Sequence, residues 1–521
     1  MRTSRLFLYI LLMGASAWWS SRAVAQGFHL RLDTIGPGWA QTGRAILELD
    51  NGDFAISSNG AWIHDSLYWS STTSLIILNS AGSYVSVSNI DVPDKLTYNG
   101  RSRSLVQLPD GKFVIGGNAV DTSLVGLPSL YWFDANGLAI MYAEIQTLPQ
   151  YIVRQMNKAH DDGFVMVGDV RVGPDIQAFL LKTDSAGQLE WSQLFGTSTY
   201  DDYFWSIEPA PDGTYYIGGV KGVGNNSWDP WLLRVDSLGN EIWSFTNGTP
   251  FDDLGQAHLV TLPDGNFVYG SGEPTGNGTD QRPQLVKVDT AGTILWSKTY
   301  DVATHGATIL GVKDVQSSGD LIACGTSVPI TPYIDGFLLR TNSQGDSLWL
   351  RHYWYTDSIM NDGTGLFFDV TPTSDGGFAA VGTMLGSIAG NDPPGASQDV
   401  WVLKVDSMGC VQPGCHIITG IESQVTNLTD ALHVYPNPVA SGGNVTVAIT
   451  LPEGLRQQPL RLSLISADGR LVQEEMVSME RKDGADTFSL PLPRSPLTPG
   501  IYMLHLSTPD TWLAATKLVV Q

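Results

Sequence analysis

Short apolar segments alternate with turn signals along most of the chain. LPDGKFVIGG at 108–117 and LPDGNFVYGSG at 262–272 are nearly identical, each an Asp-Gly turn followed by a run of apolar residues. Such runs bounded by Asp-Gly predict β-hairpins. Related segments recur 51 to 59 residues apart. The apolar residue after the turn is, in order, Phe54, Phe113, Phe164, Tyr215, Phe267, Leu321 and Phe378.

A second motif accompanies the first. It reads FLLKTDSAGQLEW at 179–191, WLLRVDSLGNEIW at 231–243, LVKVDTAGTILW at 285–296 and FLLRTNSQGDSLW at 337–349, and WVLKVDSMG at 401–409 closes the series. Each repeat therefore holds two hairpins, or four strands, and repeated units of this kind are typical of a β-propeller. We predict an all-β chain with a seven-bladed β-propeller of four-stranded blades over residues 26–410.

The last repeat lacks a fourth strand after 401–406. FHLRLDTIG at 28–36 resembles an eighth copy of the third strand and its turn. We expect the segment around Trp39 to supply the missing outer strand and close the ring, which would remove two open sheet edges. A six-bladed ring and an open array are the alternatives.

Alternating strand direction places both kinds of hairpin turn on one face of the predicted disc. The opposite face, which we call the crossing face, then carries the more variable loops, such as 219–231, 272–284 and 384–401. Recognition usually lies on variable loops of a rigid scaffold. The candidate binding residues on this face are Asp202, Asp253, Trp228, Asp229 and Trp354.

Each candidate has a structural alternative. Recurring Asp residues such as Asp202 and Asp253 cap turns and strand ends more often than they bind ligands. Trp228 and Trp354 could be buried filler instead of sugar-stacking rings. Calcium is the alternative ligand for the clustered carboxylates, although the chain has no spaced D-x-D-x-D-G loop. No other cofactor is expected.

The N-terminus predicts a signal peptide. Arg2 and Arg5 precede an apolar run over 6–17, and Ala23-Val24-Ala25 offers a cleavage site between Ala25 and Gln26. The run is too short to span a membrane, and no other segment is long and apolar enough to do so. We expect residues 1–25 to be removed and the mature chain to have no transmembrane segment.

The net charge argues against one class of partner, and the expected export bears on the state of the cysteines. The formal net charge of -23 argues against nucleic acid as a partner. Because export is expected, we predict a disulfide between Cys410 and Cys415 in MGCVQPGC, with two free thiols as the alternative. Cys324 lies in an apolar run and is expected to be buried.

The repeat stops near residue 411. Residues 411–430 form a predicted linker, and 431–521 alternate apolar strands with turns, which predicts a small β-sandwich. Tyr435-Pro436-Asn437-Pro438 stands near its start, Asp468 and Gly469 lie in the central turn, and Gly500 with Tyr502 lies near the end. On these residues the domain resembles the C-terminal sorting domain of the type IX secretion system of Bacteroidota.

The resemblance implies an export route. The signal peptide would carry the chain to the periplasm, and the type IX machinery would recognise the C-terminal domain and move the protein to the outer surface or medium. In that family the domain is often removed, and we expect cleavage between 411 and 433.

The sequence indicates the function less clearly than the export route. The chain contains no HExxH, no GxSxG and no P-loop. The favoured hypothesis is a non-catalytic surface protein that binds a glycan or another surface protein through the crossing face. The alternative is a secreted polysaccharide hydrolase or lyase with a site at the propeller axis.

Overall fold

A computed structural model of the chain describes residues 27–521 with short gaps. The gaps are 35–38, 65–67, 124, 148–149, 198, 225–226, 250–255, 276–279, 302–305, 316–318, 329–333, 356–363, 386–397, 413–414, 416–423, 427–431, 452–459, 467–470, 478–479, 483–484, 494–496 and 509–510. The elements in the described residues are β-strands. In these residues no helix is long and apolar enough to cross a membrane. The predicted cleavage site at Ala25 and Gln26 lies outside the described residues.

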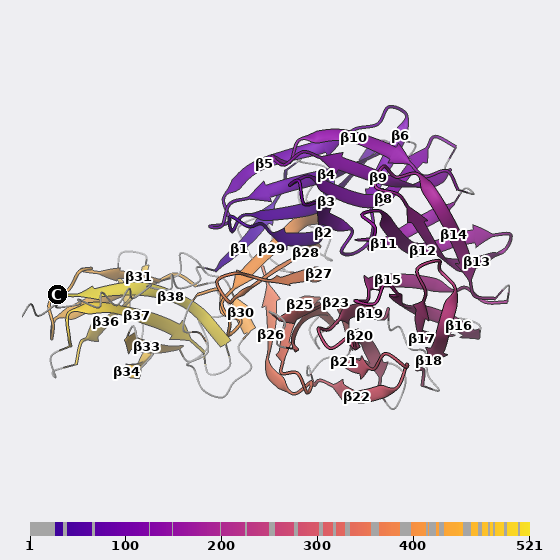
Figure 1. Ribbon diagram of the computed structural model, residues 1–521. Coiled ribbons are helices and arrows are strands. Elements are labelled where there is room, and N and C mark those ends of the chain that lie inside the picture. The colour runs from indigo at the N-terminus through magenta and orange to yellow at the C-terminus, as the bar shows by residue number, and fades with distance from the viewer. Residues whose placement is uncertain are drawn as a thin grey trace, which may run out of the picture.

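Residues 27–410 form seven antiparallel sheets, which we name I to VII (Figure 1). Each begins with an inner strand and adds the next strands outward in chain order, except that sheet VII takes its outer strand from the N-terminus. The strands of sheets I to III are β2 (Trp39–Glu48), β3 (Phe54–His64), β4 (Tyr68–Leu78) and β5 (Tyr84–Ile90); β6 (Lys95–Asn99), β7 (Leu105–Gln107), β8 (Phe113–Asp121), β9 (Gly126–Phe133) and β10 (Ala139–Glu144); and β11 (Tyr151–Lys158), β12 (Phe164–Val172), β13 (Asp175–Thr183) and β14 (Leu189–Phe195).

Sheets IV to VII follow the same plan. Their strands are β15 (Tyr203–Pro209), β16 (Tyr215–Gly224), β17 (Ser227–Val235) and β18 (Glu241–Thr246); β19 (His258–Thr261), β20 (Phe267–Pro274), β21 (Gln281–Val288) and β22 (Ile294–Thr299); β23 (Gly306–Val315), β24 (Asp320–Val328), β25 (Asp335–Thr341) and β26 (Ser347–Trp354); and β27 (Gly365–Pro372), β28 (Phe378–Leu385), β29 (Gln398–Val405) and β1 (Phe28–Leu32).

The repeated aromatic positions belong to the core. All seven aligned residues, from Phe54 to Phe378, lie at the start of the second strand of a sheet and are at most 1% exposed. Between consecutive sheets the buried side chains form apolar clusters, one for each pair from I–II to VI–VII. A further cluster combines Phe28, Val381 and Val402 of sheet VII with Ile46 and Ile76 of sheet I. The first and last sheets therefore pack on each other as neighbours do.

The source of the outer strand of sheet VII differs from the expectation. Phe28–Leu32 pairs with β29 over five residues, from Phe28 with Lys404 to Leu32 with Val400. Trp39 instead begins β2, the inner strand of sheet I, and is paired with Trp62. The expectation was wrong because the sequence of β1, an apolar alternation followed by Asp-x-x-Gly, fits a third strand and its turn as well as an outer strand. Phe28 occupies the position that a tryptophan holds in the outer strands of sheets III to VI.

A repeated contact joins each sheet to the one before it. The turn between the third and fourth strands, which we call the second turn, carries a glycine with positive φ that lies against a large side chain of the preceding sheet. At Gly239 φ is +82° and a Cβ would stand 2.7 Å from the Trp191 ring, so both the conformation and the space require glycine. The full set is Gly82 on Phe28, Gly137 on Ile77, Gly187 on Trp132, Gly239 on Trp191, Gly292 on Trp243, Gly345 on Trp296 and Gly409 on Trp349.

Both kinds of turn lie on one face of the sheets, as the strand directions require. In sheet III the Lys182 ammonium group pairs with Asp161 of the first turn, 2.6 Å away, and with Glu190, which follows the second turn. The loops between second and third strands and the crossings between sheets are therefore at the opposite ends of the strands. These ends form the crossing face.

The inner strand of sheet II is interrupted. β6 and β7 both pair with β8, and Gly100–Ser104 bulges out between them. From this bulge Arg103 reaches across to two other sheets. Its Nη1 donates to the carbonyl oxygen of Leu259 at 2.5 Å, and its Nη2 lies 2.5 Å from a Glu208 carboxylate oxygen. Arg103 has φ of +45°, an uncommon conformation for a residue with a side chain.

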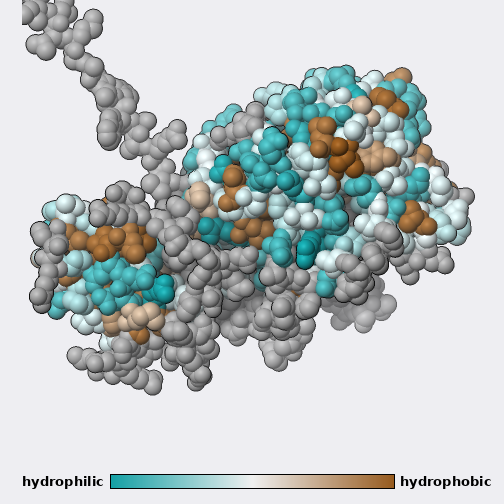
Figure 2. Space-filling model, turned by 90° about the horizontal axis from the view of Figure 1, so that it is seen from below, coloured by the Kyte–Doolittle hydropathy of each residue, from teal (hydrophilic) through white to brown (hydrophobic). Residues whose placement is uncertain are grey.

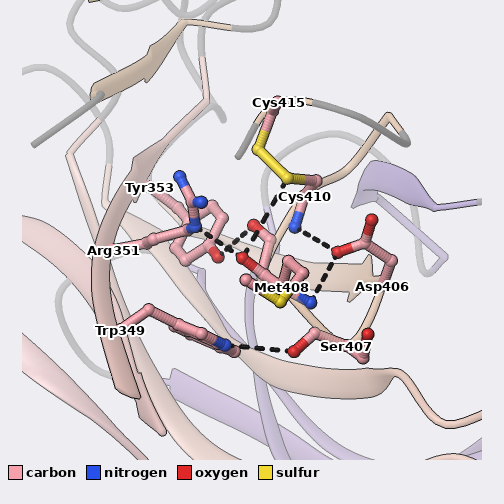
Figure 3. Close-up of a disulfide and its surroundings, with 9 residues drawn as sticks. Trp349, Arg351, Tyr353, Asp406, Ser407, Met408, Cys410 and Cys415 are labelled. Carbon is pink, nitrogen blue, oxygen red and sulfur yellow. Dashed lines mark hydrogen bonds between the residues drawn. A yellow bond between two sulfur atoms is a disulfide. The ribbon is translucent and has the colours of Figure 1, made fainter. Parts of the chain in front are cut away.

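The end of the repeat region is pinned to sheet VI by a compact turn (Figure 3). Cys410 and Cys415 form a disulfide. Asp406 accepts hydrogen bonds from the backbone nitrogens of Met408 and Cys410 at 2.8 and 2.9 Å. From β26, Trp349 donates to the carbonyl oxygen of Ser407 at 3.0 Å, and Arg351 donates to that of Met408 at 2.7 Å. Cys324 is buried and free, as expected.

The C-terminal residues form two further groups of four strands. One is β31 (Leu432–Tyr435), β32 (Asn444–Ile449), β36 (Ala485–Pro491) and β35 (Glu480–Lys482); the other is β38 (Thr511–Val520), β37 (Gly500–Ser507), β33 (Leu460–Ser466) and β34 (Leu471–Val477). Buried side chains of both groups share one apolar core, which includes Val447, Leu490, Leu464 and Leu504.

The predicted linker contributes a strand of its own. β30 (Gln424–Thr426) pairs in parallel with β26 of sheet VI, where Trp354 is opposite Thr426, and with β38, where Gln424 is opposite Thr511. Sheet VI and one C-terminal group are thereby one continuous nine-stranded sheet. In Figure 1 β30 lies between the seven sheets and the C-terminal strands.

The contact on the second turn can be tested with two glycines of the same conformation. Gly213 has φ of +87° and open space around its Cβ position, whereas Gly239 faces Trp191. Gly213→Ala should lower the free energy of unfolding by about 1 kcal/mol through backbone strain alone. Gly239→Ala should cost roughly 1–3 kcal/mol more because its methyl group overlaps the ring. Chemical denaturation of both variants measures the difference, and equal losses would contradict the contact.

The Arg103 contacts predict a large stability effect for an inner residue. Arg103→Ala leaves the buried Glu208 carboxylate without its partner and should cost about 3–5 kcal/mol of unfolding free energy. Glu208→Gln in the same chain should restore part of the loss. Lys112→Ala, which removes an exposed pair with Asp110, is the control and should leave stability nearly unchanged. A loss at Arg103 no larger than at Lys112 would show that the bulge is not held by this pair.

Candidate functional site

A pocket of about 690 Å³ opens on the crossing face between sheets I, II and III. Val120 and Gly126, at the two ends of the β8–β9 loop, and Arg171 and Ile176, at the two ends of the β12–β13 loop, fix its position on this face. We call it the arginine pocket. Its lining residues are Arg44, Asn59, Tyr98, Asn99, Arg101, Asn118, Val120, Gly126, Gln150, Tyr151, Ile152, Val153, Asp169, Arg171 and Ile176.

Three arginines from three consecutive sheets line the pocket. Arg44 comes from the middle of β2, Arg101 from the bulge after β6, and Arg171 from the end of β12. Arg44 lies over the Phe368 ring at 4.3 Å, and Arg101 lies over the Trp205 ring at 5.8 Å. These two arginines form no ion pair among the described residues, and Arg171 donates only to the carbonyl oxygen of Pro174, at 3.1 Å.

The two inner arginines perturb each other. Burial, and secondly the charge of Arg101, lowers the pKa of Arg44 to about 10. Burial also lowers the pKa of Arg101, as does the charge of Arg154, while Asp169 acts in the opposite direction. Arginine stays protonated at neutral pH despite shifts of this size. The pocket therefore gathers positive charge in a chain whose net charge is -23.

The carboxylate in the lining is already engaged. Asp169 lies 2.5 Å from Nε of Arg154, and both side chains are almost fully buried. The Arg154 guanidinium in turn lies over the Trp205 ring at 4.1 Å. Burial raises the pKa of Asp169, against the stabilising charge of Arg154. Asp169 thus holds Arg154 in place, and its charge also acts on Arg101, but within the described residues it forms no ion pair with the lining arginines.

Neutral polar groups complete the pocket. Asn118 is satisfied, since its Nδ2 donates to the carbonyl oxygen of Tyr151 at 2.7 Å and its Oδ1 accepts from the nitrogen of Val153 at 2.8 Å. Asn99 is only 6% exposed, and neither its Oδ1 nor its Nδ2 has a hydrogen-bond partner. Buried amides are normally paired, so an unpaired one in a pocket wall suits a ligand. Gln150 has φ of +73°, and such outliers concentrate at functional sites.

A second charged group lies among the inner strands, outside the pocket lining. It joins Arg103 and Glu208 with Lys313 and Asp369, and the Asp369 carboxylate also accepts from the backbone nitrogen of Ile46 at 3.0 Å. Burial raises the pKa of Asp369 and lowers that of Lys313. His258 is 2% exposed, and burial lowers its pKa to about 3. These groups link the sheets to one another across their inner edges.

The four sequence-predicted binding residues that the structure describes, Asp202, Trp228, Asp229 and Trp354, lie elsewhere on the crossing face. The Asp202 carboxylate is buried and accepts hydrogen bonds from the backbone nitrogens of Thr197 at 2.8 Å and Gly222 at 2.9 Å. It therefore has the capping role that was its structural alternative. Trp228 is half-buried and donates from Nε1 to the carbonyl oxygen of Asp201 at 3.0 Å. Burial raises the pKa of the half-buried Asp229.

These residues are only partly brought together. Gly222, which binds the Asp202 carboxylate, is the β-sheet partner of Trp228, so Asp202, Trp228 and Asp229 share the end of sheet IV. Trp354 is on β26 of sheet VI, next to β30. Asp253 lies outside the described residues. In the part of the chain that the structure describes, no group of three or more His, Cys, Asp or Glu side chains is arranged to hold a metal ion.

The sequence held one signal for the arginine pocket. NGRSRS at 99–104 interrupts the inner strand of one repeat, places two arginines in the bulge and supplies both Asn99 and Arg101. Arg44 and Arg171 had no such signal, because a single arginine in a strand is ordinary.

The rest of the described surface is mixed in character. Figure 2 shows one face on which hydrophilic residues predominate and hydrophobic ones form separate patches. Exposed apolar residues include Tyr84 and Val85 on β5 and Ile140 and Met141 on β10, all about half exposed. Small groups of exposed apolar residues are normal on protein surfaces.

Comparison with solved structures gives weak similarities. The chain aligns with the polysaccharide lyase Uly1 at 9% identity, a TM-score of 0.43 and coverage of 70% of this chain and 90% of the other. An ulvan lyase of a new polysaccharide lyase family aligns at 10% identity and a TM-score of 0.44, covering 72% of this chain and 97% of the other. Sqt1 of Chaetomium thermophilum aligns at 14% identity and a TM-score of 0.36, covering 66% of this chain and 80% of the other. TM-scores below 0.5 carry no argument about function. No curated protein sequence matches the chain.

The C-terminal strands give a clear result. Asn437 of the YPNP motif binds the last strand, β38: its Nδ2 donates to the carbonyl oxygen of Lys517 at 2.6 Å, and its Oδ1 accepts from the nitrogen of Val519 at 2.8 Å. The Tyr435–Pro436 and Asn437–Pro438 peptide bonds are both cis. Gly500 and Tyr502 lie on β37, and the Tyr502 hydroxyl donates to the carbonyl oxygen of Thr498 at 2.9 Å. Asp468 and Gly469 lie outside the described residues.

Residues 433–521 match the family model described as the secretion system C-terminal sorting domain. The chain therefore ends in a sorting domain of the type IX secretion system, which interacts with that machinery, and the protein is secreted or located at the outer cell surface.

Proposed function

We propose that this protein is a seven-bladed β-propeller that binds a glycan in the arginine pocket after export by the type IX system. The blades are sheets I to VII, and the two C-terminal groups of strands pack as a β-sandwich around their common core. Closure is supported by β1, which pairs with β29, and by the apolar cluster between sheets VII and I. A closed ring would hold the inner strands rigidly, as a binding scaffold requires.

The arginine pocket is the observation that carries this proposal. Its volume of about 690 Å³ lies within the range of roughly 300–1,000 Å³ usual for small-ligand sites. Its lining combines the unpaired amide of Asn99 and the half-buried Tyr98 with the three arginines. Amides and arginines hydrogen-bond to hydroxyl groups, and aromatic rings pack against the apolar faces of sugars. This combination suits a saccharide unit of a longer chain.

Binding is favoured over glycoside hydrolysis by the state of the carboxylates. Glycoside hydrolysis requires two carboxyl groups on either side of the scissile bond. The described pocket lining contains Asp169, which is engaged by Arg154, while Glu208 and Asp369 belong to the charged group among the inner strands. A polysaccharide hydrolase or lyase remains the second hypothesis, and reducing ends or unsaturated products released from a polysaccharide panel would support it.

The sorting domain is expected to be required for the last step of export only. A chain ending at residue 430 should fold and stay in the periplasm, because the seven sheets form their cores without the C-terminal strands. Cell fractionation and protease accessibility of intact cells would locate it, and the Ile152→Trp protein serves as a full-length control that should reach the surface. Display of the truncated chain at the surface would contradict this role.

Filling the pocket should abolish binding without unfolding the protein. Ile152 lines the pocket and is 44% exposed, so Ile152→Trp adds volume there at little cost in stability. We expect at least about a tenfold loss of affinity, or about 1.4 kcal/mol, for the polysaccharide that the parent protein retains best. Affinity electrophoresis and thermal melting measure the two effects.

Two controls locate the site. Leu194→Trp makes the same kind of change at a residue on the outer strand of sheet III that is 42% exposed, and it should not affect binding. Trp228→Ala alters the surface predicted from the sequence, with Asp202, Asp229, Asp253 and Trp354. If Trp228→Ala weakens binding and Ile152→Trp does not, that second surface is the site and the arginine pocket is not.

A further inference from the structure

We propose that the glycan bound by the arginine pocket is anionic, and that Arg44, Arg101 and Arg171 bind its carboxylate or sulfate groups. This inference rests on the proposed glycan-binding function and adds the chemical class of the ligand.

The lining of the pocket carries an excess of positive charge. It contains three arginines and one described carboxylate, that of Asp169, which pairs with Arg154. Elsewhere in the described structure arginines are commonly matched: Arg234 pairs with Asp212, Arg103 with Glu208 and Arg461 with Glu474. The arginine pocket departs from this pattern.

This arrangement of arginines is energetically costly in the free protein. Arg44 is partly buried, packs on Phe368, and lies near a second cation, Arg101. Withdrawing a guanidinium group from water without a partner is unfavourable, and a neighbouring like charge adds to the cost. An anion placed between Arg44 and Arg101 would relieve both effects. A neutral sugar would relieve neither.

The geometry of the hydrogen-bond donors also suits an anionic group. Guanidinium groups bind carboxylate and sulfate oxygens through paired N–H donors. Because Arg44, Arg101 and Arg171 come from sheets I, II and III, they enter the pocket from three separate strands or strand ends. The unpaired amide of Asn99 provides a donor and an acceptor for a neighbouring hydroxyl group. The arrangement fits a sugar that carries both an anionic group and hydroxyls.

Because the protein as a whole is negatively charged, attraction of a polyanion has to come from the arginine pocket itself. With a formal net charge of -23, the protein repels polyanions at long range. At about 0.15 M salt such repulsion is screened beyond roughly 8 Å, whereas contacts inside a pocket are screened much less. Binding of a polyanion at this ionic strength therefore reports on the pocket and not on a general attraction.

The test uses three polymers that differ in charge. The purified protein is run by affinity electrophoresis at about 0.15 M salt through gels containing polygalacturonate, dextran sulfate or uncharged dextran. We expect retardation by at least one of the two anionic polymers and none by dextran. Retardation by polygalacturonate alone assigns the pocket to carboxylates, and retardation by dextran sulfate alone assigns it to sulfate esters.

Charge-removing variants connect the effect to the pocket. Arg44→Gln and Arg171→Gln should each lower the affinity for the retarding polymer about tenfold or more, because each removes a charged hydrogen-bond donor. Arg282→Gln removes an exposed arginine at the corresponding end of sheet V and should have no effect. Because Arg44 is partly buried, its replacement would also lower stability, so the melting temperatures of the variants are recorded. Arg171 is exposed, and Arg171→Gln therefore tests the charge without a loss of stability.

The outcomes separate this inference from the proposed function. Equal retardation by dextran, or retardation by a polyanion that Arg44→Gln and Arg171→Gln leave unchanged, overturns the anionic assignment. Failure of both anionic polymers, together with pocket-dependent binding of a neutral glycan, also overturns it and leaves glycan binding intact. If the protein binds no glycan at all, the proposed function fails with it.

Discussion

The glycine on the second turn of each sheet, resting on a large side chain of the sheet before it, sets the spacing of the seven sheets. The glycine has positive φ and offers no Cβ, so the neighbouring ring can approach the backbone directly. In two cases the ring also donates a hydrogen bond to the same turn: Trp243 to the carbonyl oxygen of Thr290 at 3.1 Å, and Trp349 to that of Ser407 at 3.0 Å. One backbone conformation thus serves both the hairpin and the packing between sheets.

The same contact accounts for the unequal character of the two faces. The turns on one face are tied to their neighbours, and their sequences repeat closely. The second turns lie away from the crossing face, whose loops and strand ends vary in length and composition. The arginine pocket arises there, where sheet II departs from the repeat: the Gly100–Ser104 bulge brings Arg101 to the pocket and anchors itself through Arg103. The seven sheets tolerate an irregular inner strand in sheet II because the neighbouring strands keep their pairing.

How far the sequence predicted this structure depends on the kind of signal. The four-stranded repeat, the core positions from Phe54 to Phe378 and the sorting domain could be predicted, since each rests on local patterns that recur or match a known family. The outer strand of sheet VII was assigned to the wrong segment, because Phe28–Leu32 resembles a third strand. In addition, the pairing of strands that are far apart in the sequence leaves no local sequence pattern. The arginine pocket could not be predicted, since it is built from residues between 44 and 176 that are related only through the packing of three sheets.

The short strand β30 has a consequence for the separation of the two parts of the protein. It joins β26 on one side and β38 on the other by parallel pairing, so backbone hydrogen bonds connect the sorting domain to sheet VI in addition to the peptide chain. A protease cut on the N-terminal side of Gln424 leaves β30 with the departing domain and exposes the edge of β26. A cut after Thr426 leaves β30 as a cover on that edge, and the position of the cut therefore determines whether the released protein carries an open strand that another chain can join.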